Sequence, residues 1–198
     1  MVFQLPLYQI EHDTFESMKT FFFSDPHFGH YNIIEYQNRP FQTTDEMDAM
    51  IIENWNRVVA TQDHVFLLGD VSIHSPDKTC EILGQLNGKI TLVLGNHDRR
   101  RLMEQTRRFD LVTPYPILYD NFFLLSHEPV FVNEQCPFCN IHGHTHLNRF
   151  ENTLLHINVS AECIDYTPIA FGEIRNMVKE RLKKYNAMKN QLVRRKKQ

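Results

Sequence analysis

Five short motifs rich in Asp, Asn and His constrain this 198-residue chain more than any other feature, because four of them directly follow short apolar runs. The motifs are Asp25-Pro26-His27, Gly69-Asp70, Gly95-Asn96-His97-Asp98, Ser126-His127 and Gly143-His144-Thr145-His146. The apolar runs before the first four occupy residues 20–24, 65–68, 90–94 and 122–125, and a further run covers residues 155–159. Such runs are typical of buried strands, and ligands of α/β proteins bind beyond the carboxyl ends of strands. The sequence therefore predicts strands that deliver these polar groups at their carboxyl ends.

Helical patterns lie between and after the predicted strands. Thr43, followed by Glu46 three residues later, forms a capping-box pattern that predicts a helix start. Further helices are predicted from Ser75-Pro76 to Asn87-Gly88, after Asp98, and from about Gly172. Because strands and helices alternate early and strands cluster late, we predict an α/β (α+β) layered sandwich that forms one domain over residues 1–198.

Charge is distributed unevenly along the chain. Residues 1–172 hold 11 Lys and Arg against 22 Asp and Glu, whereas residues 173–198 hold 10 against 2. The basic helix end and tail, residues 179–198, is either a nucleic-acid contact or a solvated terminus. The sequence shows no leader pattern and no apolar run near the roughly 20 residues of a membrane span. With four cysteines, too few for a disulfide framework, this predicts a cytoplasmic protein.

The motif side chains combine carboxylate, carboxamide and imidazole groups, which suit catalytic divalent cations such as Mn, Fe, Ni, Co or Zn. Asp25 and His27 are two residues apart after a strand, so an extended backbone would direct both to one side. His144 and His146 repeat this spacing. Glycines at positions 69, 95 and 143 remove side chains where the backbone turns beside the cations.

The ordered set D-x-H, G-D, G-N-H-D, a lone H and G-H-x-H resembles the calcineurin-like metallophosphoesterase superfamily. The match spans Asp25 to His146 with every motif present in order. Any one of these motifs is weak evidence, but five in series are highly specific. The neighbouring segments Phe28-Gly29-His30 and Asn32-Ile33-Ile34 resemble compact bacterial and phage members.

The resemblance implies a four-layer αββα sandwich with two mixed β-sheets, and it implies two metal sites. One cation would bind Asp25, His27, Asp70 and His146. The other would bind Asp70, Asn96, His127 and His144, so that Asp70 bridges the pair. Manganese is the favoured metal. His97 would not bind metal but would lie by the scissile phosphate, held in place by Asp98.

The implied reaction is phosphoester hydrolysis by a metal-bridging hydroxide, with His97 as the general acid that protonates the departing alkoxide. A phosphodiester, of nucleotide or cyclic-nucleotide type, is the favoured substrate because no long insertion separates the motifs. The alternatives are a phosphomonoesterase or phosphoprotein phosphatase, a nuclease that uses the basic tail, and a binding module that has lost the chemistry.

Several other residues have two interpretations each. His30, Asn32 and Arg39 either contact substrate or pack within a loop. Arg99 is either a phosphate clamp or part of a solvated basic turn. The pair Cys136 and Cys139 forms a lone C-x-x-C motif, for which we expect buried free thiols rather than a zinc or redox site.

Overall fold

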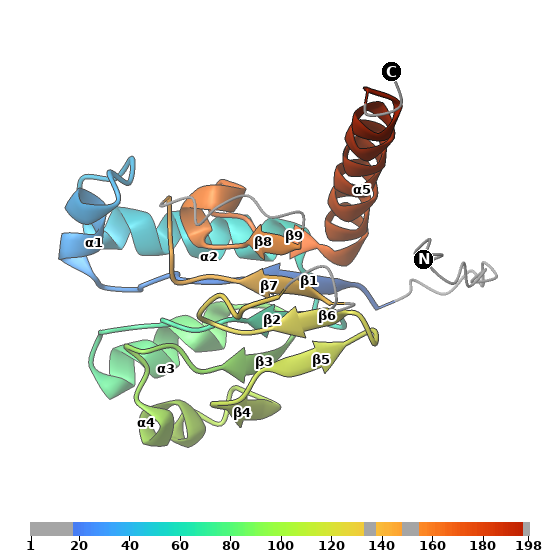
Figure 1. The fold of residues 1–198 in the computed structure, drawn as a ribbon. Helices are drawn as coiled ribbons and strands as arrows, with labels where there is room; N and C mark the ends of the chain where they lie inside the picture. The colour runs from blue at the N-terminus through green and yellow to red at the C-terminus, as the bar shows by residue number, and fades with distance from the viewer. Residues whose placement is uncertain (1–17, 133–137, 148–154, 196–198) are drawn as a thin grey trace.

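The computed structural model describes residues 18–132, 138–147 and 155–195, and it contains two mixed β-sheets (Figure 1). The first sheet has the order β4-β3-β2-β1-β9 and the second the order β5-β6-β7-β8. The strands are β1 Thr20–Phe23, β2 His64–Leu67, β3 Lys89–Val93, β4 Leu111–Thr113, β5 Ile117–Tyr119, β6 Phe123–Leu125, β7 Cys139–His142, β8 His156–Asn158 and β9 Ile169–Ala170. Strands β1 to β4 are parallel to one another, as are β6 to β8. β9 pairs antiparallel with β1, and β5 pairs antiparallel with β6, each at an edge of its own sheet.

Four helices cover one face of the first sheet. They are α1 Tyr31–Tyr36, α2 Thr44–Val58, α3 Pro76–Gln85 and α4 Arg100–Gln105. Their buried side chains, among them Met47, Trp55 and Leu83, pack in one cluster with Phe23 and Leu67 of the sheet. The predicted helix start is confirmed, because the Thr43 hydroxyl accepts the Glu46 amide. The Glu46 carboxylate accepts the amide of Gln42, one residue before the N-cap, so the reciprocal bond of a full capping box is shifted by one residue.

A second apolar cluster fills the space between the two sheets. Phe22 and Phe66 of the first sheet pack in this cluster with Leu125 and Ile141 of the second. The rings of Phe22 and Phe66 stack with their centroids 5.6 Å apart. Helix α5, Phe171–Arg195, adds Ile174 and Val178 to this cluster and then projects beyond the sheets (Figure 1). The predicted sandwich of two mixed sheets with helices is thereby confirmed. No helix among the described residues is long and apolar enough to span a membrane.

Four strands and one helix were not predicted, and their brevity explains this. β4, β5 and β9 have two or three residues each, and α1 is a six-residue helix that buries Ile33 and Ile34. β7 reads Cys-Asn-Ile-His, which lacks an apolar pattern although all four residues are buried. Its Asn140 is satisfied by hydrogen bonds to the Leu124 carbonyl and the Ser126 hydroxyl.

The cysteine and tail predictions are only partly covered by the structure. Cys139 is a buried free thiol, as expected, and burial raises its pKa to about 12. Cys80 and Cys163 are exposed, whereas Cys136 lies outside the described residues. The last three residues of the basic tail also lie outside, so nucleic-acid binding there stays a prediction.

Candidate metal centre

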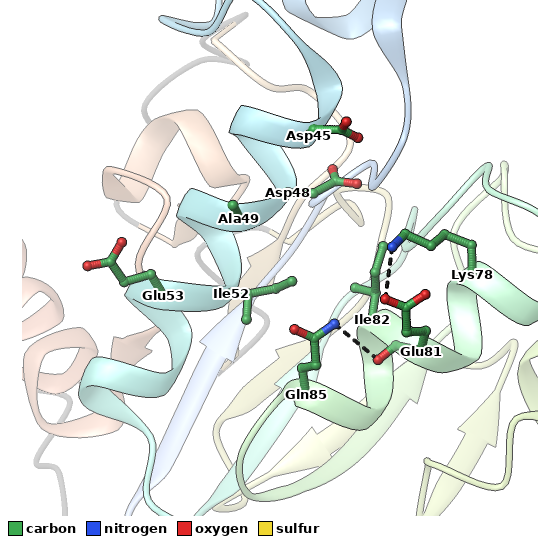
Figure 2. Close-up of a pocket in the computed structure, with 9 residues that line it drawn as sticks. All are labelled: Asp45, Asp48, Ala49, Ile52, Glu53, Lys78, Glu81, Ile82 and Gln85. Atoms are coloured by element: carbon green, nitrogen blue, oxygen red, sulfur yellow. Dashed lines mark hydrogen bonds and ion pairs between the residues drawn. The ribbon is translucent and has the colours of Figure 1, made fainter.

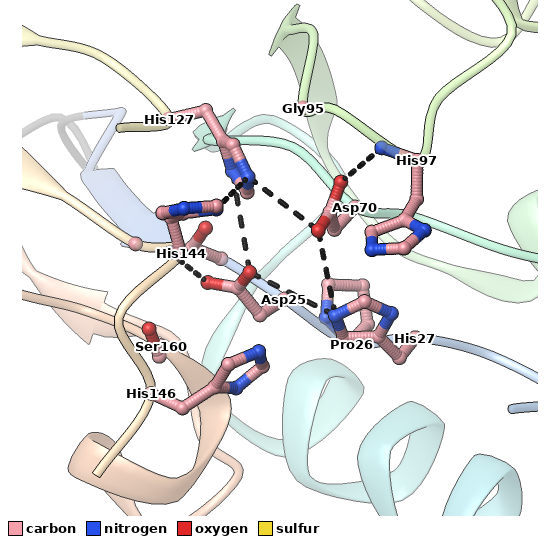
Figure 3. A network of polar contacts seen from close by, with 12 residues as sticks. Asp25, Pro26, His27, Asp70, Gly95, His97, His127, His144, His146 and Ser160 are labelled. Carbon is pink, nitrogen blue, oxygen red and sulfur yellow. Dashed lines mark hydrogen bonds and ion pairs between the residues drawn. The ribbon is translucent and has the colours of Figure 1, made fainter. Parts of the chain in front are cut away.

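The motif side chains meet where strand ends of the two sheets converge. β1, β2 and β3 run parallel, so the segments after them leave the same edge of the first sheet. The segments that follow β6 and β7 reach this edge from the second sheet. The His144 amide donates to Asp25 Oδ2 at 2.9 Å, and His127 Nδ1 lies 2.7 Å from the Leu68 carbonyl oxygen. These contacts join the two sheets at the site, and Figure 3 shows the one between His144 and Asp25.

Six of the seven predicted ligands form two clusters in which the candidate ligand atoms lie within 4.8 Å of one another. The clusters are Asp25, His27 and His146, called the first cluster here, and Asp70, His127 and His144, called the second cluster. The seventh predicted ligand, Asn96, belongs with the second cluster, because its Oδ1 lies 3.0 Å from both His127 Nε2 and His144 Nδ1.

Asp70 lies between the two clusters. Its Oδ2 is 3.5 Å from His27 Nε2 and 3.4 Å from His127 Nε2, one histidine from each cluster. Its other oxygen, Oδ1, accepts the backbone amide of His97 at 2.9 Å, which fixes the carboxylate plane. This is the placement that a bridging carboxylate requires.

Left-handed backbone, and not an extended chain, directs the paired motif residues. The φ angles are +58° at Asp25, +52° at His27, +65° at His144 and +47° at His146, so the expected extended geometry was wrong. Asp70 has the same conformation, with φ of +54°. A non-glycine residue in this region costs about 1 kcal/mol or more, and such strain is concentrated at functional sites. The convergence therefore depends on surrounding contacts that hold these turns.

Two glycines allow the backbone to approach the carboxylates. A Cβ at Gly95 would collide with Asp70 Oδ1, and one at Gly143 would collide with Ser24 Oγ and Asp25 Oδ2. Neither has a positive φ, so close approach and not turn geometry requires them. Gly69 meets both needs, because its φ is +93° and a Cβ there would lie 2.6 Å from His127 Nδ1.

Electrostatics differ between the two clusters. Burial lowers the pKa of His27 to about 3, so its ring is neutral and offers a lone pair. In the second cluster, burial opposes the charge on His127, but the Asp70 hydrogen bond and the Asp25 and Asp70 carboxylates raise its pKa to about 9. Burial likewise acts against the Asp70 carboxylate, yet His127 and the His97 amide lower the pKa of Asp70 to about 2.

Buried atoms that lack partners show that the clusters fit a cation. Among the described residues, Asp25 Oδ1 and both ring nitrogens of His27 are buried and accept or donate no hydrogen bond. Leaving such groups unpaired costs about 1–3 kcal/mol each, which a bound cation would offset. Oxygen and imidazole donors suit a divalent metal of the Mn-to-Zn series. The residues present therefore fit a metal centre.

His97 lies at the exposed edge of this centre, but Asp98 does not hold its ring. The imidazoles of His97 and His27 are 5.5 Å apart between centroids (Figure 3). Both oxygens of Asp98 instead accept backbone amides, from Asp70 and Gly95 at 2.9 Å and from Val71 at 2.8 Å. The expected orientation of His97 by Asp98 was therefore wrong. Asp98 ties the loops after β2 and β3 together.

The four residues predicted as possible substrate contacts lie in different surroundings. Arg39 is buried and donates to the carbonyls of Asp25 and Pro26, so it supports the backbone and cannot contact substrate. His30 lies at the mouth, with its ring centroid 5.3 Å from that of His27, and its Nδ1 is buried without a partner among the described residues. Asn32 on α1 and Arg99, the N-cap of α4, are exposed, and their substrate contacts stay predictions.

Sequence reasoning missed Glu162. This buried carboxylate lies 3.2 Å from His146 Nδ1 and forms an ion pair with Arg39. It belongs to the short 3-10 helix η1, Ala161–Ile164, which contains none of the five motifs. No local pattern marks it, because its partners lie 16 and 123 residues away along the chain.

A groove between α2 and α3 lies apart from the metal centre. Acidic side chains line it, including Asp45, Glu53 and Glu81, with Lys78 paired to Glu81 (Figure 2). It contains none of the motif residues.

Two mixed sheets between helices, with Asp and His clusters at their strand ends, define a metal-dependent hydrolase of the α/β sandwich class. The chain matches the calcineurin-like phosphoesterase family over residues 18–177 and belongs to that family. It is therefore a metal-dependent phosphoesterase.

Similar proteins occur in other organisms and in a phage. An uncharacterized protein of Methanocaldococcus jannaschii, MJ1445, is 35% identical over 176 residues, which is 82% of this chain and 92% of that protein. The gene 66 protein of Mycobacterium phage L5 is 38% identical over 82 residues, which is 40% of this chain and 39% of the phage protein. The crystal structure of AQ665 from Aquifex aeolicus, a protein of unknown function, superposes with a TM-score of 0.67 at 29% identity, covering 81% of this chain and all of that one.

Replacing Gly143 by alanine tests the close approach at the first cluster. The added methyl group must displace the Asp25 carboxylate or the His144 segment, so we expect a loss of about 1–3 kcal/mol in stability and weaker Mn²⁺ binding. Gly84→Ala in α3 is the matched control, because open space surrounds it and alanine favours a helix by about 1 kcal/mol. Thermal melts and Mn²⁺ titrations measure both, and wild-type Mn²⁺ affinity in Gly143→Ala would contradict the steric argument.

The pKa of His127 predicts that metal binding releases a proton. At about 9, this pKa leaves the ring protonated at neutral pH in the metal-free chain. A cation must displace that proton, so its affinity should rise by up to about tenfold per pH unit below pH 9. Conversely, protonation of His127 stabilises the metal-free fold fully below about pH 6.5, and this contribution is lost as pH rises through 9. Mn²⁺ titrations between about pH 6 and 8 measure the effect, and pH-independent affinities would contradict it.

Proposed function

We propose that this chain is a binuclear metal-dependent phosphodiesterase that acts on nucleotide-type substrates. The observation that carries the binuclear proposal is the position of Asp70, whose Oδ2 lies 3.5 Å from His27 and 3.4 Å from His127. Proteins hold two neighbouring cations by placing a carboxylate between two clusters of Asp, Asn and His ligands.

The ligand assignment follows the two clusters. Asp25, His27 and His146 with Asp70 would hold one cation, and His127, His144 and Asn96 with Asp70 the other. We propose Mn²⁺ as the first metal to test, with Fe, Ni, Co and Zn as alternatives, because the donors are oxygen and imidazole nitrogen. When bound, such a pair activates water for attack on phosphorus and offsets the charge of the phosphate oxygens.

The chain's own residues supply the remaining steps. His97 is exposed at the edge of the centre and next to His27, where it can donate a proton to the leaving oxygen of an ester bound there. His30 lies on the same side, with its ring centroid 6.3 Å from that of His97. It can therefore contact a phosphate oxygen or the second ester group.

The open surroundings of the site favour a diester. Asn96 and His97 are exposed. Within residues 18–132, α1 and α2 connect β1 to β2, α3 connects β2 to β3, and α4 connects β3 to β4. A phosphodiester carries a substituent on each side of phosphorus, and an open edge leaves room for both. Specificity within such folds comes from loops around a shared core.

Comparing two chromogenic esters tests the substrate class. With Mn²⁺ present, we expect bis-(p-nitrophenyl) phosphate to be hydrolysed with a higher kcat/KM than p-nitrophenyl phosphate. Chelation of the metal should abolish both activities, and the other four cations serve as parallel trials. Faster monoester cleavage would assign the chain to the phosphomonoesterases. Inactivity with every cation bound would indicate a binding module.

Replacing His97 by alanine tests the general acid. We expect kcat to fall by about 10²–10⁴-fold for a diester with an alkoxide leaving group, such as a cyclic nucleotide. The loss should be much smaller for a p-nitrophenyl ester, because that leaving group needs little protonation. The variant should keep both metal ions by elemental analysis. Gln105→Ala, an exposed change in the neighbouring helix α4, is the control. Equal losses for both esters would exclude the proton-donor role.

A further inference from the structure

Arg39, Glu162 and His146 form a continuous buried chain beside the first cluster. Glu162 Oε1 accepts a hydrogen bond from Arg39 Nε at 2.7 Å and lies 2.6 Å from Nη2 in the ion pair. Both carboxylate oxygens of Glu162 lie 3.2 Å from His146 Nδ1. The side chains are 0% exposed at Arg39, 3% at Glu162 and 11% at His146. A buried charge is tolerated only when it is paired, so each member depends on the next.

The Glu162 carboxylate determines which nitrogen of His146 carries the proton. Glu162 Oε1 lies directly against the Arg39 guanidinium, so the carboxylate is held as an ion pair and offers only acceptor oxygens to His146. Nδ1 of His146 must therefore be the donor. In the neutral ring this leaves the lone pair on Nε2, which is the atom that remains for a cation.

Arg39 connects the same carboxylate to the D-x-H motif. Its Nη2 donates to the Asp25 carbonyl at 2.8 Å and its Nη1 to the Pro26 carbonyl at 2.9 Å. These carbonyls belong to the left-handed turn that presents Asp25 and His27. One guanidinium thus holds both the turn of the first motif and the carboxylate that orients the last motif.

We propose that Arg39 and Glu162 are positioning residues that prearrange the first cluster, fixing His146 with Nε2 free and Asp25 in its strained turn before a cation arrives. This inference rests on the proposed metal site. The second cluster has a different support, because a backbone carbonyl, that of Leu68, orients His127. Changes at Glu162 should therefore weaken one of two metal sites and spare the other.

Two substitutions of Glu162 separate the effects of the proton position from those of charge. In Glu162→Gln, the amide oxygen should stay with Arg39, which leaves the NH₂ group facing His146 Nδ1. That group donates, so the ring proton should move to Nε2 and block the ligand atom. In Glu162→Ala, neither nitrogen is selected, and the metal-free ring should become a mixture of tautomers.

The test combines Mn²⁺ titration with ¹⁵N NMR of the histidine rings in the metal-free chain. Wild type should bind two Mn²⁺ and, at a pH where the His146 ring is neutral, show the Nδ1–H form, with the signal assigned by its absence in His146→Gln. Both Glu162 variants should weaken one Mn²⁺ site by about 10–100-fold and leave the other unchanged. Glu162→Gln should show the Nε2–H form. Arg39→Lys keeps the charge but loses the forked contacts, and it should weaken the same site.

Asp63→Asn controls for loss of stability alone. Asp63 is buried and accepts the Lys19 and Ala60 amides just before β2, at the end of the sheet opposite the metal centre. We expect this variant to melt at a lower temperature with unchanged Mn²⁺ affinity and an unchanged His146 signal.

The outcomes distinguish this inference from the proposed function. If wild type binds two Mn²⁺ and the Glu162 variants bind both with wild-type affinity and the same tautomer, the positioning role is overturned and the metal centre stands. If wild type binds no Mn²⁺, the proposed function fails. The tautomer of His146 in the metal-free chain still decides whether Glu162 orients it, and an Nε2–H form in wild type would refute that.

Discussion

The Asp25 carboxylate, buried where the two sheets meet, is the group on which the rest of the site depends. The backbone amide of Asp25 donates to the Gly69 carbonyl, and the Asp25 carbonyl accepts from Arg39. Its side-chain Oδ2 accepts the amide of His144, which follows β7 of the second sheet. Only Oδ1 has no hydrogen bond among the described residues, and it lies 3.9 Å from His27 Nε2 and 4.0 Å from His127 Nδ1. Because every other polar group of Asp25 is used, the strained left-handed turn cannot relax without breaking contacts to both sheets. The contacts that join the two sheets are thus the same contacts that hold the site in place.

The two clusters are supported by different means, and this has consequences for how the site is assembled. The first is held by side chains, through the ion pair of Arg39 and Glu162. The second is held by backbone, through the Leu68 carbonyl and the loops that Asp98 binds together. Backbone supports tolerate sequence change nearby, whereas a buried ion pair loses its function when either partner is replaced. The Asp70 carboxylate lies between the two clusters. Its Oδ1 accepts the backbone amide of His97, which belongs to the loop that Asp98 holds.

Family membership explains the chemistry of the metal centre but does not identify the substrate. The fold and the clusters are those of a metal-dependent phosphoesterase, and such folds host many substrates on one core. The helices nearest the exposed edge of the metal centre are short. These are α1, which follows His30, and α4, which follows Arg99, and each has six residues. Neither helix covers the exposed His97, which leaves this edge of the centre open.

The sequence by itself determined the features that depend on local rules. These are the capped helix at Thr43, the longer strands, and the identity of the clustered side chains, because four of the five motifs follow predicted strands whose direction fixes where they end. Short elements such as β7 escaped, since four residues without an apolar pattern gain their strand from neighbours. Only the tertiary structure decided that Asp98 binds backbone, that the motif residues are left-handed, and that Arg39 meets Glu162 from 123 residues away. Such contacts depend on how distant segments pack, and no spacing along the chain encodes them.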